Sequence, residues 1–150
     1  MHGLFNLCQM KYLITFLVVV LALAKASSQE VIGTWKTIDD VTGIVKSHVE
    51  IYKREGKIYG KVAQILDRNA TANPICKNCE GAFKDAPILG LEIIQGLEKK
   101  GGVYKGGEIL DPENGKTYTC KIWLNEEDTD QLMVRGYVAF FYRTQTWERL

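Results

Sequence analysis

Three cysteines carry the sharpest chemistry in this sequence. Cys76 and Cys79 form a C-x-x-C within a long polar segment, and Cys120 lies in a strand-like run further along the chain. In an oxidising compartment a bridge is expected, and three thiols cannot all pair. The preferred interpretation is a Cys76–Cys79 disulfide with Cys120 buried as a small apolar side chain. A bridge from either loop cysteine to Cys120 is the alternative.

Two other uses of these thiols are weaker. A thioredoxin-like redox role needs the C-x-x-C at a helix N-terminus near a βαβ pattern, which this chain does not show. A zinc site would combine the three cysteines with His48, but no second closely spaced pair of ligands accompanies them. The expectation is therefore no metal and no cofactor.

Candidates for catalysis are few. Downstream of the N-terminal region the sequence has one histidine, His48, and it has no Gly-x-Ser-x-Gly, so a Ser-His-Asp arrangement has little to build on. Glu50 and Lys61, flanked by Tyr52 and Tyr59, are the most interesting polar group. Their ordinary place is the solvated outer face of a hairpin; a polar pocket would require the neighbouring valines and isoleucines to face water. The prediction is a non-enzymatic protein, with an enzyme of unknown reaction as an alternative.

The N-terminal region predicts export. Lys11, the apolar run "YLITFLVVVLALA" and the small residues around Lys25 have the order of a secretory signal peptide. The run is shorter than the roughly 20 apolar residues of a membrane-spanning helix. We expect residues 1–28 to be a leader, with Met10 as an alternative start, residues 29–150 to be one domain, and the product to be periplasmic or secreted and not membrane-spanning.

Charge argues against nucleic acid as a partner. Removing the leader takes Lys11 and Lys25 from nineteen basic residues and leaves seventeen against eighteen acidic ones. The basic residues are scattered singly, without the patch that a nucleic-acid binder shows.

Alternating side chains predict an all-β fold. In "KSHVEIYK" and "KIYGKVAQIL" apolar and polar residues alternate, as in half-buried strands. If Glu55-Gly56 is the two-residue turn between them, then Tyr52 faces Tyr59, Glu50 faces Lys61 and Val49 faces Val62. Each pair matches in character, which a slip of one residue would destroy.

Further strand candidates bring the count to about eight. The segment "GGEILDPENGKTYTCKIWL" predicts a second hairpin around Asp-Pro-Glu-Asn-Gly, and other candidates are 31–38, 88–94, 132–138 and 144–149. Eight antiparallel strands close into an up-and-down barrel without exposed edges, wide enough inside for side chains or one small ligand.

Trp35 is suited to closing one end of such a barrel. Its Gly-x-Trp on the first strand resembles the signature of lipocalins and fatty-acid-binding proteins, and the resemblance implies a lipocalin- or calycin-like barrel whose tryptophan is covered by an arginine of the last strand. Arg149, or less favourably Arg143, is the candidate arginine.

A wider resemblance covers almost the whole chain after the leader. The motifs "GTWKTIDDVTG", "VEIYKREGKIYGKV", "CKNCEG", "PILGLEIIQGL", "GGEILDPENGKTYTCKIWL", "VRGYV" and "RTQTWER" resemble the pattern of an uncharacterised family of exported bacterial proteins, domain of unknown function 2147. This resemblance implies a periplasmic or secreted lipocalin-like barrel and brings no activity with it.

The predicted function is the binding of a small apolar or amphipathic ligand inside the barrel. The expected ligand-binding residues are Trp35, Val49, Ile51, Val62, Ile109, Tyr118, Ile122 and Val134. The same inner wall is expected to include Ile58, Leu124 and Val138. Such a wall suits an acyl chain and equally suits a packed core without a cavity.

The competing interpretation is a packed barrel that acts through its surface, as a protein-interaction or envelope-associated module. Trp123 lies opposite Cys120 on its strand, and Met133, Tyr137 and Phe141 are expected on one face of a later strand, where they would form a partner or homodimer surface. The segment 67–87 is expected to lie across the open mouth of the barrel, fastened by the C-x-x-C, with Ile75 and Phe83 as an apolar plug.

Overall fold

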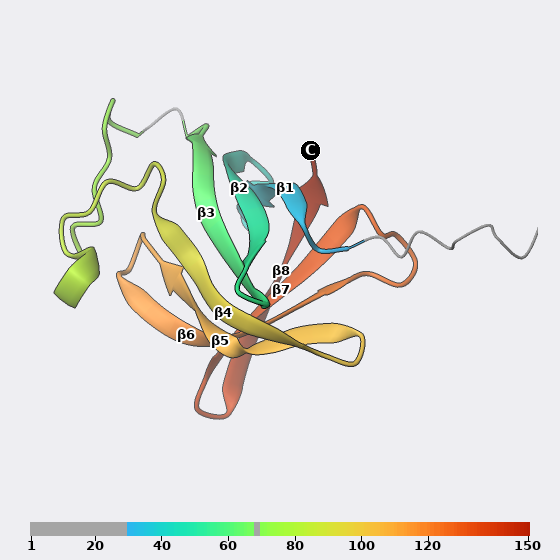
Figure 1. Cartoon of the computed structure of the whole chain (residues 1–150). Helices are drawn as coiled ribbons and strands as arrows, with labels where there is room; N and C mark the ends of the chain where they lie inside the picture. Colours follow the sequence, from blue (N-terminus) through green and yellow to red (C-terminus); the bar gives the residue numbers. More distant parts are fainter. Residues whose placement is uncertain (1–29, 68–69) are drawn as a thin grey trace, which may run out of the picture.

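The protein is a closed antiparallel barrel. The computed structural model describes residues 30–67 and 70–150, and within them eight strands pair in chain order, with the first strand also pairing with the last (Figure 1). The strands are β1 Gly33–Ile38, β2 Val45–Arg54, β3 Lys57–Ile65, β4 Glu92–Lys100, β5 Val103–Asp111, β6 Lys116–Leu124, β7 Gln131–Val138 and β8 Phe141–Arg149, with a short 3₁₀ helix, η1, at Gly81–Phe83. The predicted eight-stranded up-and-down barrel is confirmed.

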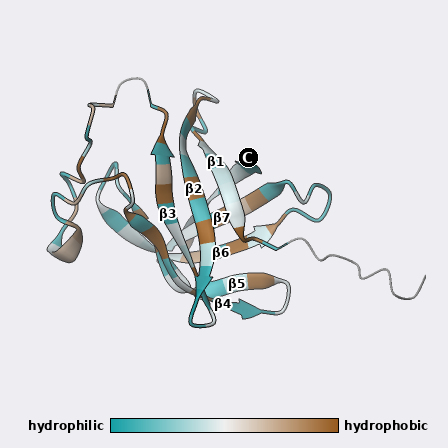
Figure 2. Cartoon of the chain, turned by 45° about the horizontal axis from the view of Figure 1, so that its top comes forward, coloured by the Kyte–Doolittle hydropathy of each residue, from teal (hydrophilic) through white to brown (hydrophobic). Residues whose placement is uncertain are grey.

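The register predicted for the first hairpin is confirmed residue by residue. Val49 pairs with Val62, Glu50 with Lys61, and Tyr52 with Tyr59. The turn residues Glu55 and Gly56 both have positive φ, as a two-residue hairpin turn of this kind requires. The alternation of apolar and polar residues that fixes this register is visible along β2 and β3 (Figure 2).

Several predicted strands differ from the observed ones: the first and last candidates, 31–38 and 144–149, are observed as Gly33–Ile38 and Phe141–Arg149. The candidate at 88–94 is displaced, because β4 runs from Glu92 to Lys100. The prediction that Phe141 continues the strand of Met133 and Tyr137 is wrong. A turn at Ala139, which has a φ of 49°, ends β7 at Val138 and makes Phe141 the first residue of β8.

The up-and-down topology gives the barrel two different ends. The chain enters β1 and leaves β8 at one end, which also carries the β2–β3, β4–β5 and β6–β7 turns; we call this the closed end. The loops after β1, β3, β5 and β7 lie at the other, which we call the open end.

The predicted leader, residues 1–28, lies outside the described residues. Within the described part of the chain, no helix has the length and hydrophobicity needed to span a bilayer.

Candidate functional site

Trp35 and Arg149 pack against each other at the closed end. The Trp35 side chain is fully buried, and its Nε1 donates a hydrogen bond to the carbonyl oxygen of Val31 at 2.8 Å. The Arg149 guanidinium carbon lies 4.2 Å from the centre of the Trp35 ring, and Arg149 Nε donates to Asp130 Oδ1 at 3.1 Å. Arg143, the other candidate arginine, lies near the open end.

The closed half of the interior is sealed. Six inward-facing residues of the predicted wall in this half are each at most 3% exposed: Val49, Ile51, Ile58, Val62, Ile122 and Val134. Leu97, Leu132 and Trp147 join them in one hydrophobic cluster. These residues therefore face inward as expected and form a packed core.

Cys120 lies at the border of this core that faces the open end, and it pairs with Gly136 on β7. Its side chain is 1% exposed, and burial raises the pKa of the thiol to about 12. The thiol is therefore protonated and unreactive in the folded barrel at neutral pH.

The open half of the interior is accessible to solvent. Cross-strand pairing places a second set of residues on the inner wall, at the open-end border of the core and beyond it, and each is partly exposed: Thr37, Ser47, Ile65, Ile109, Tyr118, Gly136 and, beside Val134 at the lower edge of the set, Gln145. Directly paired residues share a face, so these positions point the same way as the buried ones below them. We call this set the cup.

The cup combines an apolar base with polar walls. Thr37 Oγ1 and Ser47 Oγ lie 2.8 Å apart across β1 and β2. On β8, Gln145 Oε1 accepts a bond from Trp147 Nε1 at 3.3 Å, and among the described residues its amide nitrogen has no hydrogen-bond acceptor. The Tyr118 hydroxyl accepts a bond from Asn114 Nδ2 at 2.9 Å. Donors and acceptors thus lie on the inner wall above a hydrocarbon core.

Charged pairs surround the mouth of the cup. Arg143 Nε donates to Asp40 Oδ2 at 2.9 Å, and this hydrogen bond raises the pKa of the arginine. Lys46 forms ion pairs with Asp39 at 3.5 Å and with Glu113, and its pKa is raised chiefly by the hydrogen bond to Glu113. Hydrogen bonds from Thr42 lower the pKa of Asp39 to about 2. The mouth therefore presents paired charges of both signs at neutral pH.

Val138 is a correction to the predicted inner wall. It is 54% exposed, because β7 ends at this residue and nothing covers it at the open end. Ile109 and Tyr118 are partly exposed in the cup, so the predicted wall spans both the packed half and the cup; Leu124 is also partly exposed, but at the closed end, where β6 ends.

The segment between β3 and β4 does not plug the mouth, contrary to expectation. Phe83 lies with Ile93 and Leu110, whose positions alternate with the inward-facing Ile94 and Ile109, so it covers the outer face of β4 and β5. A crevice of about 10 Å³, room for about one water molecule, lies between them. Ile75 is partly exposed and forms an isolated bridge with Pro87.

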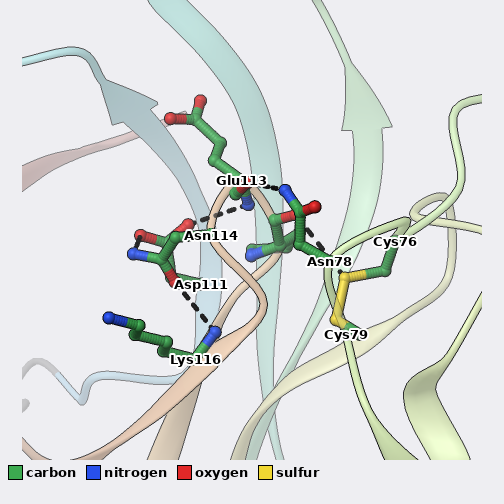
Figure 3. Close-up of a disulfide and its surroundings, with 8 residues drawn as sticks. Cys76, Asn78, Cys79, Asp111, Glu113, Asn114 and Lys116 are labelled. Atoms are coloured by element: carbon green, nitrogen blue, oxygen red, sulfur yellow. Dashed lines mark hydrogen bonds between the residues drawn. A yellow bond between two sulfur atoms is a disulfide. The ribbon is translucent and has the colours of Figure 1, made fainter.

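A disulfide joins Cys76 and Cys79 in this loop, as predicted. Figure 3 shows the bridge beside the β5–β6 turn, where Asn78 Nδ2 donates to the Glu113 carbonyl oxygen at 2.8 Å. Gly115 has a φ of 74°, and a Cβ there would overlap the Asn78 carbonyl. The bridge therefore shapes a loop that docks by close backbone contact on the β5–β6 turn.

Reduction of this disulfide is expected to release the loop and leave the barrel folded. A bridge across so few residues constrains little chain entropy, so its loss should lower the free energy of unfolding by no more than about 2 kcal/mol. Trypsin should then cut faster at Lys77 and Lys84, both exposed in the loop. Gly115→Ala, which displaces Asn78, should produce the same cuts without reductant. Global unfolding on reduction would contradict this picture.

The outer face of β2, β3 and β4 carries a closed network of paired charges. Glu50 and Lys61 are 3.1 Å apart, and Arg54 binds Glu92 through two hydrogen bonds while stacking 3.9 Å from the centre of the Tyr59 ring. Burial and the bond to Glu92 raise the pKa of Tyr52 to about 12. Every group has a partner and points away from the barrel, as expected for a structural outer face.

The residues considered for zinc are not brought together. His48 lies on the outer face of β2, since its neighbour Val49 points inward, whereas Cys120 is inside the barrel and the other two cysteines are bridged. No group of three potential metal ligands occurs within residues 30–67 and 70–150.

Sequence reasoning missed most of the cup. Thr37 and Ser47 stand two residues from Trp35 and Val49, so extending the alternation by one step would have put them on the inner wall. Nothing in the sequence marks Gly136 or Gln145 as partly exposed interior positions.

Comparison with known proteins supports the fold and the family. Residues 33–149 match the family model described as "Uncharacterized protein conserved in bacteria (DUF2147)". No curated protein matches the sequence. A solved structure of protein HP1028 from Helicobacter pylori, described as belonging to the lipocalin family, superposes with a TM-score of 0.67 at 24% sequence identity, covering 81% of this chain and 83% of that one.

Proposed function

The chain belongs to the bacterial family DUF2147, and from that membership and its cup we propose that it is an exported binding protein for a small amphipathic ligand. The observation that carries the proposal is the division of the interior. Apart from Leu124 at the end of β6, the inward-facing side chains of the closed half are buried, whereas those of the open half are partly exposed.

The depth of the cup sets the size of the ligand. Beyond the layer of Cys120 and Gly136, β7 contributes two residues and β6 four before the mouth, which makes the open half about 7 to 13 Å deep. That depth suits a ring system or the head of a lipid. A long acyl chain would need the closed half, which Trp35 and its neighbours fill.

The polar side chains of the cup determine the chemistry of the ligand. Thr37, Ser47 and Gln145 offer hydroxyl and amide groups to a polar part of the ligand, and Arg143 at the mouth can exchange Asp40 for a ligand carboxylate, sulfonate or phosphate. Ile65 and Ile109 offer apolar contact beside them. We assign no catalytic step to these groups, because the only histidine among the described residues, His48, lies on the outer face.

Export is supported by two features. The N-terminal sequence has the order of a secretory leader, and a Cys76–Cys79 disulfide persists in an oxidising compartment such as the periplasm or the extracellular space.

An amphiphile titration tests the proposal. Anilinonaphthalene sulfonate, an anionic aromatic probe, should bind the folded protein with a rise in fluorescence. Gly136→Leu should weaken binding at least about tenfold, because the new side chain occupies the cup. A Cβ at this position makes only ordinary contacts with Tyr118 and Ile109, so the barrel should fold.

The matched control is Thr119→Leu, which places the same leucine side chain on the outer face of β6. It should bind the probe as the unmodified protein does, and circular dichroism should show both variants folded. Equal binding by all three proteins would place the probe outside the cup and refute the proposal.

A further inference from the structure

The β7–β8 hairpin has an unusually exposed apolar tip. Phe140 is 98% exposed and Phe141 80%, and Val138 beside them is also open to solvent. The hairpin extends past the neighbouring strands in Figure 1. Large apolar side chains grouped at a protruding turn have no partner within the described part of the chain.

Aromatic residues follow below the tip on the outer face. Tyr137 and Tyr142 pair across the two strands with ring centres 6.0 Å apart. Arg135 comes next: its guanidinium carbon lies 4.2 Å from the centre of the Tyr142 ring, and its Nε donates to Thr144 Oγ1 at 2.7 Å. The arginine is thus held in place, and among the described residues nothing accepts a hydrogen bond from its two terminal nitrogens, which can bind an anion.

Arg135 belongs to a row of like charges. Cross-strand pairing places Lys105, Lys121 and Arg135 directly opposite one another on β5, β6 and β7. Like charges in this relation destabilise a sheet. Among the described residues no carboxylate forms a salt bridge with any of the three. Glu98 faces Lys105 from β4, but its carboxylate binds Lys57 at 3.0 Å.

The outer face of β2, β3 and β4 does not repeat this row of like charges. There Glu50 pairs with Lys61 and Arg54 with Glu92, so unlike charges face each other. The cations of the row lie against an aromatic ring: Lys121 is 4.8 Å and Arg135 5.0 Å from the centre of the Trp123 ring. Such a row is complementary to a surface that carries many anions.

The order of these groups matches the layers of a membrane surface. Phenylalanine side chains insert into the acyl boundary, tyrosines lie at the headgroup level, and lysines and arginines bind lipid phosphates. Arg135 is three residues from the end of β7, which places it about 10 Å from the tip. An interfacial segment buries its apolar part to about 5 to 10 Å.

We propose that the β7–β8 hairpin docks the protein on an anionic lipid bilayer, with Phe140 and Phe141 inserted and the basic row against the lipid phosphates. This orientation places the β7–β8 corner of the open end against the bilayer. Cations at the mouth offset most of its acidic charge, because Asp40 is paired with Arg143 and Asp39 and Glu113 share Lys46. The inference does not depend on a ligand in the cup.

Vesicle flotation tests the docking. The protein should float with phosphatidylcholine vesicles that contain phosphatidylglycerol, much less with phosphatidylcholine alone, and less at high salt. The double variant F140S/F141S should bind at least about tenfold more weakly, since the insertion of each ring is lost. K121Q and R135Q should each weaken binding by about fivefold.

Two control substitutions lie at the closed end: Leu150→Ser removes an exposed apolar side chain and Lys53→Gln an exposed cation. Both should float as the unmodified protein does, and all the substituted positions except Lys121 and Arg135 are exposed enough to leave folding intact. Soluble glycerol phosphate should not displace the protein from vesicles.

Failure to bind vesicles that contain phosphatidylglycerol, or binding that survives F140S/F141S, would overturn the docking proposal. Neither outcome bears on the cup, because probe binding to Gly136→Leu and its control is measured without lipid.

Discussion

Replacement of Trp35 by alanine is expected to lower the free energy of unfolding by about 3 to 5 kcal/mol. The side chain is fully buried among the core residues of the closed half, so its removal leaves a cavity. It also strands the Val31 carbonyl and takes away the ring beneath the Arg149 guanidinium. Since domains of this size are stable by about 5 to 15 kcal/mol, much of the stability should be lost. Urea denaturation followed by far-ultraviolet circular dichroism measures this.

Trp123→Ala is the matched control. Trp123 lies on the outer face of β6, partly exposed, where Lys121 and Arg135 approach its ring. Replacing it with alanine should lower the free energy of unfolding by roughly 1 kcal/mol, mostly because the cation–π contacts are lost. Equal costs for the two tryptophans would show that Trp35 does not hold the closed end together.

Gly107→Ala should be the second most damaging single change. The residue lies beside the irregularity in β5, and a Cβ there would overlap the Gln95 carbonyl and lie 2.8 Å from the Leu97 nitrogen on β4. The obstacle is backbone, so β4 and β5 would have to separate. We expect a loss of about 3 kcal/mol, at the upper end for overpacking, and a lower melting temperature in calorimetry.

Gly102→Ala in the turn of the same hairpin provides the comparison. A Cβ at Gly102 meets no atom within 4 Å, and its φ is not in the left-handed region. This variant should be neutral or slightly more stable, because alanine reduces the freedom of the unfolded chain. A melting temperature for Gly107→Ala equal to that of Gly102→Ala would contradict the close approach of β4 and β5.

The barrel could be predicted from the sequence where local chemistry decided the pairing. Glu55-Gly56 fixes a two-residue turn, and the alternation on both sides of it allows one register only. The same rules placed the end of β7 at Val138 but failed for Phe141, which they assigned to the strand face of Met133 and Tyr137, since a run of apolar residues without glycine or proline does not show where the turn at Ala139 lies. They also misplaced β4, because the apolar residues from Ile88 onward serve partly to anchor the preceding loop.

The cup was beyond prediction for a different physical reason. Alternation tells which face of a strand a side chain occupies, but the exposure of that face depends on how tightly the other strands fill the interior. Val49 and Ser47 share a face, yet one is sealed and the other is reached by solvent. In the same way, Ile93 and Leu110 are apolar residues on the outer face because Phe83 packs against them, and the sequence pattern does not show the path of the loop that carries Phe83.

Mass spectrometry of the protein purified from the compartment in which it accumulates tests the central claim most directly. Mass measurement under native conditions, followed by solvent extraction, should reveal a bound small amphiphile in a stoichiometric fraction of molecules. The Gly136→Leu variant, prepared in parallel, should carry none, whereas Thr119→Leu should retain it. An empty unmodified protein, or an amphiphile retained equally by Gly136→Leu, would contradict the proposal that the open half of this barrel is a binding site.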